Sequence, residues 1–316
     1  MTFPEQQAGL NYLTEGGTET EIMYKFGFDL PEFAVFPLLD NPRAVTELRG
    51  MYERYLDTAA RHGFAALMGG FDYRASPDWA GKLGYSADQL ADLQLRAIDF
   101  LREAAKPYLN ELPAVKFVGT LGPRGDAYEI NATITADEAE DYHSVQMETL
   151  VEAGVDLVSA LTFNSVDEAI GVARAAARFG LPLSMSFIID HYTSRLQTGP
   201  TLKNALETVD AQAGDARPAF YGINCSHALE FMPALEPGDW INRVRSLRPN
   251  AAMADKISLC TLGHLEEGNP VELGKLMGGL ARQHPHIDIW GGCCGTWETH
   301  FEEIARNVRE ARGVTG

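Results

Sequence analysis

The chain has 316 residues, of which 45% are hydrophobic and 22% are charged, and its formal net charge is -18. This size permits a large core and falls within the range of α/β barrels, while the acidic balance favours solubility and argues against a nucleic-acid surface. We find no apolar run long enough to span a membrane. The first ten residues lack the apolar segment of a secretory signal, and four cysteines do not make a disulfide framework, so we expect a cytoplasmic protein.

Short apolar runs that end in small or polar residues predict eight β-strands. These runs lie at residues 11–14, 64–68, 115–119, 157–163, 183–189, 220–224, 251–257 and 287–290. Helical spacing predicts helices at 44–61, 87–105, 136–153 and 166–179. Thr135 and Glu138 have the spacing of a capping box before the third helix, and Gly180 and Pro182 follow the fourth.

Strands that alternate with helices indicate parallel pairing with right-handed crossovers. Eight such units predict a closed (β/α)₈ TIM barrel, with an open doubly wound sheet as the alternative. We see no linker rich in proline, glycine or serine, and no close sequence repeat. A single domain over residues 1–316 is the simplest organisation.

The most informative chemistry lies in three cysteines at predicted strand ends. Cys225 ends the sixth strand, and the adjacent Cys293 and Cys294 follow the eighth. Because strand ends in a barrel open onto one face, we expect these sulfurs to converge. Three thiolates are suited to Zn²⁺, and a fourth, open position is typical of a catalytic zinc site.

Simpler explanations exist for cysteines and glycines in such places. Free cysteine is often buried filler, and we assign Cys260 no role for that reason. Gly291 and Gly292 follow the last strand, where barrels often bind phosphate, but a phosphate site would leave the paired cysteines unexplained.

Five segments resemble the homocysteine S-methyltransferase family, which includes betaine– and S-methylmethionine–homocysteine methyltransferases. The specific ones are Asn224-Cys225 and the run from Gly291 to Thr296. Weaker ones are Glu15-Gly16-Gly17-Thr18, residues 119–123 and residues 194–199. The resemblance spans roughly residues 11–304. It implies a (β/α)₈ barrel in which Cys225, Cys293 and Cys294 bind Zn²⁺ and are catalytic.

The chemistry expected of such a centre is methyl transfer to sulfur. The thiolate is the nucleophile, and an open zinc position deprotonates and orients a small-molecule thiol acceptor, most simply homocysteine giving methionine. The methyl donor is cationic: betaine, S-methylmethionine or another sulfonium. Aromatic faces suit such a donor, and we name Phe71, Tyr73, Trp79 and Phe163 as candidates. We expect no nucleic-acid or membrane partner, and the sequence is compatible with a homo-oligomer.

For substrate binding we predict Glu15, Gly16, Gly17, Thr162, Asn164 and Asn224.

The sequence departs from the family at the acceptor end. Glu15 stands where the family has Asp, and Leu161 stands where the family has a Glu that recognises the amino group of homocysteine. The acceptor is then a different thiol, or Glu15, Glu19 or Asn164 replaces that carboxylate. Arg124 in place of a Tyr and Ser226-His227 after Cys225 are further departures; His227 either caps the loop or touches substrate.

Two other classes of function remain open. A barrel lyase or aldolase would bind phosphate near Gly291-Gly292 and use a strand-end Lys256 or Asp190. A non-catalytic zinc or thiol sensor would close the fourth zinc position with a side chain such as His227.

Overall fold

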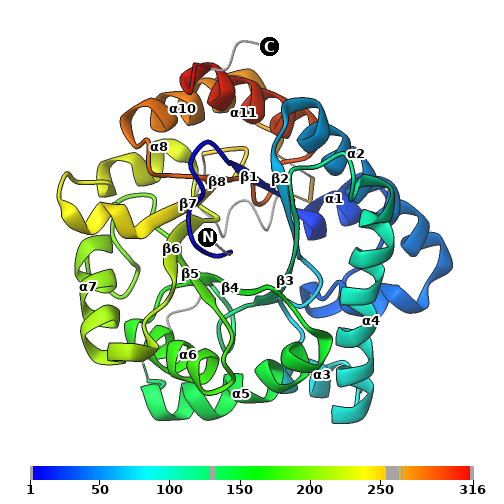
Figure 1. The fold of residues 1–316 in the computed structure, drawn as a ribbon. Helices are drawn as coiled ribbons and strands as arrows, with labels where there is room; N and C mark the ends of the chain where they lie inside the picture. Colours follow the sequence, from blue (N-terminus) through cyan, green and yellow to red (C-terminus); the bar gives the residue numbers. More distant parts are fainter. Residues whose placement is uncertain (1–2, 129–132, 254–262, 265, 314–316) are drawn as a thin grey trace.

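Eight parallel strands close into a barrel in sequence order, β1 to β8, and helices surround it (Figure 1). The computed structural model describes residues 3–128, 133–253, 263–264 and 266–313. The ring is completed by pairing of β1 with β8, where Tyr12 opposes Ile289 and Leu13 opposes Trp290. The predicted (β/α)₈ TIM barrel is therefore confirmed, and the open-sheet alternative is wrong.

The strands are β1 (Tyr12–Thr14), β2 (Ala65–Met68), β3 (Val115–Leu121), β4 (Leu157–Phe163), β5 (Leu183–Phe187), β6 (Phe220–Asn224), β7 (Val244–Arg248) and β8 (Ile289–Trp290). The helices are α1 (Thr18–Tyr24), α2 (Pro42–His62), α3 (Pro77–Lys82), α4 (Ala87–Ala105), α5 (Ala136–Ala153), α6 (Val166–Arg178), α7 (Leu202–Ala213), α8 (Ala228–Phe231), α10 (Pro270–Gln283) and α11 (Glu298–Ala311). Short 3-10 segments are η1 (Pro31–Phe33), η2 (Phe36–Asp40), η3 (Lys106–Tyr108), η4 (Gly214–Ala216), η5 (Met232–Ala234) and η6 (Asp239–Arg243).

Most predicted elements agree with the structure to within a few residues, and the predicted capping box is present. Thr135 accepts from the backbone of Glu138, whose side chain accepts from Thr135 in return. The seventh strand is the exception. It runs over Val244–Arg248, whereas residues 251–253 of the predicted segment form no strand and 254–257 lie outside the described residues.

The seventh strand was missed because its arginines hide an apolar pattern. Arg245 is buried and binds Asp288 with distances of 2.9 and 2.6 Å. Arg248 is buried and binds Glu15 at 2.8 Å. Both carboxylates are distant in sequence, and buried charges are stable when paired and hydrogen-bonded. Because arginines are usually exposed, the sequence pattern predicted the seventh strand a few residues later than β7 lies.

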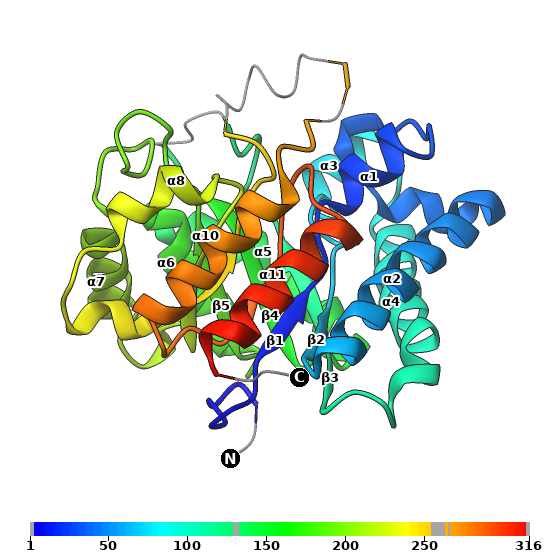
Figure 2. The same ribbon diagram turned by 90° about the horizontal axis from the view of Figure 1, so that it is seen from above.

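Apolar side chains fill the layer between barrel and helices and also the lower barrel interior. The outer layer includes Tyr55, Leu56, Ile98 and Leu101 from α2 and α4, all fully buried. Figure 2 turns the barrel on its side and shows α10 and α11 side by side, near the seam where β1 meets β8. This packing leaves the carboxyl ends of the strands to form the site.

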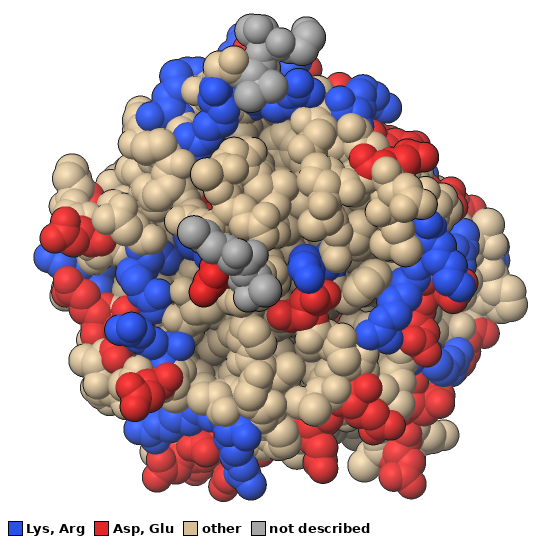
Figure 3. Space-filling view, viewed as in Figure 1, with Lys and Arg blue, Asp and Glu red and all other residues tan. Residues whose placement is uncertain are grey.

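Charged side chains of both signs mix around the face seen in Figure 3, where the N-terminal segment crosses the barrel. No continuous basic patch is visible on that face. Among the described residues, no helix combines the length and the apolar character needed to cross a bilayer.

Candidate active site

The three predicted cysteines lie together at the carboxyl end of the barrel. Cys225 follows β6, while Cys293 and Cys294 lie in the loop after β8. Their sulfur atoms are all within 4.8 Å of one another. Of the described residues, these are the His, Cys, Asp and Glu side chains that form a group of three able to hold a metal ion.

The spacing of the sulfurs fits a tetrahedral metal. Two sulfurs that each lie about 2.3 Å from a tetrahedral zinc ion are separated by about 3.8 Å. The Sγ atoms of Cys225 and Cys294 are 3.8 Å apart. The set is thus compatible with zinc, and three protein ligands leave one coordination position for a substrate.

Crowding and burial favour the protonated form of these thiols. Hydrogen bonding with Cys225, reinforced by burial, raises the pKa of Cys293 to about 12. The same neighbour, Cys293 and burial raise the pKa of Cys294 well above its usual range. Three crowded thiolates would repel one another, so deprotonation requires a positive charge among them.

Asn224 connects the cysteines to β4. Its Oδ1 accepts from the backbone N–H of Thr162 at 2.8 Å, and its Nδ2 donates to Thr162 Oγ1 at 2.9 Å. The same Nδ2 lies 3.9 Å from Cys293 Sγ. Thr162 and Cys225 have positive φ angles of 68° and 56°. Such backbone is strained in non-glycine residues and persists when its surroundings hold it, as these bonds do for Thr162.

The loop that carries the paired cysteines is fixed from two sides. The N–H of Cys293 donates to Pro249 O at 2.8 Å, and the N–H of Ala251 donates to Cys294 O at 3.0 Å. On the other side lies Gly17, where a Cβ would come within 2.8 Å of Cys293 O and 2.9 Å of Cys294 Cα. Glycine at this position permits close packing, and the residue lines neither of the two cavities beside the sulfurs.

A small cavity of about 50 Å³ lies on the barrel side of the sulfurs. Four of the six predicted substrate residues line it: Glu15, Gly16, Thr162 and Asn224. Leu161 and Glu19 line it as well. Burial raises the pKa of Glu19 to about 7, and the charge of Cys293 adds to that rise.

Arg248 also lines the small cavity and was not predicted. Its Nη2 donates to Glu15 Oε1 at 2.8 Å, and Glu15 Oε2 accepts from the N–H of Gly69 at 3.2 Å. Glu15 therefore reaches the cavity as a paired carboxylate. Arg248 was missed because it belongs to the strand that sequence reasoning placed wrongly.

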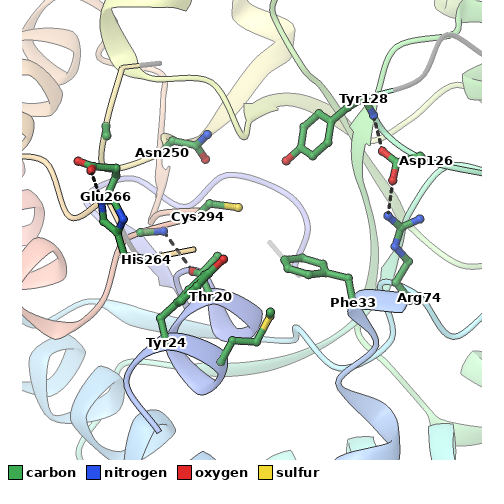
Figure 4. Close-up of a pocket in the computed structure, with 13 residues that line it drawn as sticks. Thr20, Tyr24, Phe33, Arg74, Asp126, Tyr128, Asn250, His264, Glu266 and Cys294 are labelled. Carbon is green, nitrogen blue, oxygen red and sulfur yellow. Dashed lines mark hydrogen bonds and ion pairs between the residues drawn. The ribbon is translucent and has the colours of Figure 1, made fainter. Parts of the chain in front are cut away.

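A larger cavity of about 230 Å³ lies on the outer side of Cys294 (Figure 4). Its lining includes the aromatic rings of Tyr24, Phe33 and Tyr128. In Figure 4 the rings of Phe33 and Tyr128 lie across the opening from Cys294. Both rings also line the small cavity, so they stand between the two spaces.

Tyr128 touches the cysteine centre directly. Its Oη lies 3.1 Å from Cys225 Sγ. Burial, followed by the charge of Cys225, raises the pKa of Tyr128 well above its usual range, so the hydroxyl keeps its proton. Two acidic groups occupy the rim of the larger cavity: Asp126, 3.3 Å from Arg74, and Glu266, 2.7 Å from His264.

The aromatic candidates named from sequence lie mostly elsewhere. Tyr73 lines the small cavity. Phe71 stacks on Tyr52 in the core, Phe163 is fully buried, and Trp79 packs against Arg74 and Lys82. The rings that do line the larger cavity come from α1, η1 and the loop after β3, where no sequence pattern marked them.

Several polar candidates have structural partners away from both cavities. Asn164 Nδ2 donates to Ala127 O at 3.0 Å. His227 caps α8, because its Nδ1 accepts from the N–H of Leu229 at 3.3 Å. Arg124 Nε lies 3.2 Å from Asp78. Of the two roles considered for His227, the structure shows the cap.

Of the residues proposed for a lyase or aldolase, those that the structure describes have structural roles. Asp190 Oδ1 accepts from the backbone of Tyr192 and Thr193 and closes a turn. At Gly292 an added Cβ would meet Thr296 Oγ1 at 2.1 Å, so that side of the loop is already filled. Lys256 and Cys260 lie outside the described residues.

Comparison with known proteins agrees with this geometry. The model of the family described as homocysteine S-methyltransferase matches residues 12–308. The homocysteine S-methyltransferase of Escherichia coli (strain K12) is 24% identical over 231 residues, covering 67% of this chain and 68% of its own. Crystal structures of the E. coli homocysteine methyltransferase MmuM share the fold. The oxidized form superposes with a TM-score of 0.71 at 21% identity over 94% of this chain and 95% of that one, and the metallated form with 0.70 at 20% over 95% and 96%.

Proposed function

This chain belongs to the homocysteine S-methyltransferase family, and from that membership we propose that it is a zinc-dependent enzyme that moves a methyl group from a cationic donor to a thiol. The acceptor is homocysteine, which becomes methionine. The observation that carries the proposal is the convergence of three cysteine sulfurs at the spacing of a tetrahedral zinc site.

Cys225, Cys293 and Cys294 would hold the ion. A bound zinc ion would supply the acidity that turns an acceptor thiol into a thiolate at neutral pH. Asn224 holds the β4 and β6 ends in register, and Gly17 supports the loop of the paired cysteines. These contacts fix the sulfur positions before substrates arrive, which is the condition for orienting two reactants.

The two cavities separate the two substrates. Glu15, Thr162 and Asn224 surround the small cavity, whose polar lining suits the amino-acid end of the acceptor. The larger cavity suits the donor, because Tyr24, Phe33 and Tyr128 offer aromatic faces to a sulfonium or quaternary ammonium group. Cys294 lines both cavities, so the donor methyl and the acceptor sulfur can meet there.

In the proposed methyl transfer one bond forms as another breaks. The acceptor sulfur forms a bond to the methyl carbon while the bond between that carbon and the donor sulfur or nitrogen breaks. The thiol proton goes to solvent, and the donor leaves as a neutral sulfide or amine. The hydroxyl of Tyr128 retains its proton and is placed to orient Cys225 rather than to act as a base.

The test is metal analysis combined with a donor panel. Protein purified under reducing conditions should carry zinc and should methylate homocysteine from betaine, S-methylmethionine or a related sulfonium, as read by mass spectrometry. Freshly purified, reduced protein without zinc, or zinc protein that methylates no thiol from any donor, would contradict the proposal. X-ray absorption should show an added sulfur ligand when homocysteine binds; an unchanged zinc environment would favour the sensor alternative.

A further inference from the structure

Arg248 is the only basic side chain among the described residues that line the small cavity. Its guanidinium lies beside the cysteine loop, since Nε donates to Gly292 O at 3.2 Å, one residue before Cys293. Nη2 donates to the backbone and side chain of Glu15 at 3.2 and 2.8 Å. Nη1 forms no hydrogen bond with any residue that the structure describes, so it can donate to a ligand oxygen.

The small cavity does not offer an ammonium group a comparable free carboxylate at Glu15. Both oxygens of Glu15 are engaged, one by Arg248 and one by the N–H of Gly69. Leu161, on the β4 wall, offers a buried apolar surface. An ammonium group entering this cavity would have to compete with Arg248 for Glu15, or turn to Glu19, the other acid of the described lining. A carboxylate meets an open donor instead.

We propose that Arg248 binds the carboxylate of the acceptor, and that the acceptor class is thiols that carry a carboxylate, with the α-amino group dispensable. The inference rests on the proposed function and narrows its acceptor. Guanidinium and carboxylate form short charge-assisted hydrogen bonds, and the buried setting excludes the water that would weaken them. The Glu15 contact keeps the guanidinium in place before the acceptor binds.

Three small thiols of matched length test the inference without any mutation. Homocysteine carries both groups, 4-mercaptobutyrate lacks the amino group, and 3-aminopropane-1-thiol lacks the carboxylate. Each is titrated calorimetrically into zinc-loaded protein without donor, and kcat/KM is then measured with one active donor. We expect 4-mercaptobutyrate to stay within about threefold of homocysteine and 3-aminopropane-1-thiol to bind about 10- to 100-fold more weakly, as expected for a lost charged hydrogen bond.

Two variants separate recognition from structural support. Arg248→Gln combined with Glu15→Gln removes the cation without leaving a buried unpaired carboxylate, and Glu15→Gln alone is the matched control. The double variant should weaken both carboxylated thiols about 10- to 100-fold and leave 3-aminopropane-1-thiol unchanged. Glu15→Gln alone retains the cation but removes the carboxylate that holds it in place, so it should weaken 4-mercaptobutyrate less than the double variant does.

Specific results would overturn the inference. Equal weakening of all three thiols by the double variant would make Arg248 structural only. A preference above tenfold for homocysteine over 4-mercaptobutyrate, lost in Glu19→Gln, would place amino-group recognition at Glu19. Methyl transfer that prefers 3-aminopropane-1-thiol would refute the role of Arg248 and leave the proposed function standing. No transfer to any thiol would refute the proposed function itself. If the double variant fails to fold, the panel on the unaltered chain still decides.

Discussion

The two cavities that meet at Cys294 are built from different parts of the fold. The small one is lined mainly by strand ends and the residues directly after them, including Glu15, Thr162, Asn224 and Arg248. The larger one is lined by α1, η1 and connecting loops, with Tyr24, Phe33 and Tyr128 as its rings. Directional hydrogen bonds hold the side chains of the small cavity, while the larger cavity offers mainly the faces of aromatic rings to a ligand.

This difference implies that the two substrates are recognised by different means. Side chains on barrel strands hold their positions closely, as a reacting sulfur and its charged tail require. Loops vary and tolerate change, which suits a donor that is recognised by its cationic surface. We therefore expect small substitutions on the acceptor side to change activity sharply and those on the donor side to change it gradually.

The largest effect should come from Cys294, which belongs to both cavities. Cys294→Ala removes one of three sulfurs and should lower zinc affinity and methyl transfer by more than the roughly 10- to 100-fold loss typical of a residue that only supports a ligand. Zinc content by mass spectrometry and turnover of homocysteine measure this. Cys260→Ser, at the one cysteine of the four that has no assigned role, is the control and should retain metal and activity. Full metal and turnover in Cys294→Ala would end the three-sulfur assignment.

A smaller effect is expected at Asn224, on the strand-built side alone. Asn224→Ala leaves the N–H of Thr162 without its partner and should destabilise the fold by about 1–3 kcal/mol. Zinc affinity should fall about 10- to 100-fold, because Cys293 loses its neighbouring amide. Denaturant unfolding and competition with a chelator measure the two effects. An unchanged zinc affinity would show that the strand ends do not preorganise the sulfurs.

On the donor side the effect should be graded. Tyr24 lines the larger cavity and not the small one. Tyr24→Leu should raise the KM for the donor about 2- to 30-fold, the equivalent of about 0.5–2 kcal/mol of cation–π attraction, with the KM for the thiol unchanged. Tyr24→Phe keeps the ring and should behave like the unaltered chain. If Tyr24→Phe raises the KM for the donor as much as Tyr24→Leu does, the hydroxyl and not the ring recognises the donor.

The smallest effect on methyl transfer is expected at a buried acid, Asp72, behind the small cavity. Asp72 precedes the cavity-lining Tyr73, and burial raises its pKa to about 7. The folded chain therefore holds this proton more tightly than the unfolded chain. The resulting stability is fully present below about pH 4 and is lost as the pH rises through about 7.

Asp72→Asn should remove that dependence. Its unfolding free energy should exceed that of the unaltered chain above pH 7, and the difference should shrink toward pH 4, as measured by denaturant unfolding at several pH values. Asp88→Asn, at an exposed position, serves as the control and should follow the unaltered chain. Parallel curves for Asp72→Asn and the unaltered chain would mean that Asp72 is ionised in the folded state.

The sequence was most informative where local pattern and tertiary role coincide. The helices α4 and α5 match their predicted bounds because caps and apolar spacing are local signals. The cysteines were found because few roles suit paired thiols after a strand. Arg248 and Tyr128 were missed because their partners, Glu15 and Cys225, lie 233 and 97 residues away. Neither contact leaves a trace in a short window of sequence.

The close packing of Gly17 against the paired cysteines has a consequence for folding. The sulfurs come from β6 and β8, while Gly17 follows β1, so the packing around the paired cysteines is complete only after β1 and β8 have closed the ring. Contacts between the two ends of a chain form against a large loop-closure entropy. A bound ion would link the loops after β6 and β8, and Gly17 would support the second of these loops only once the ring is closed. Metal uptake during refolding should therefore become tighter when the first and last strands pair.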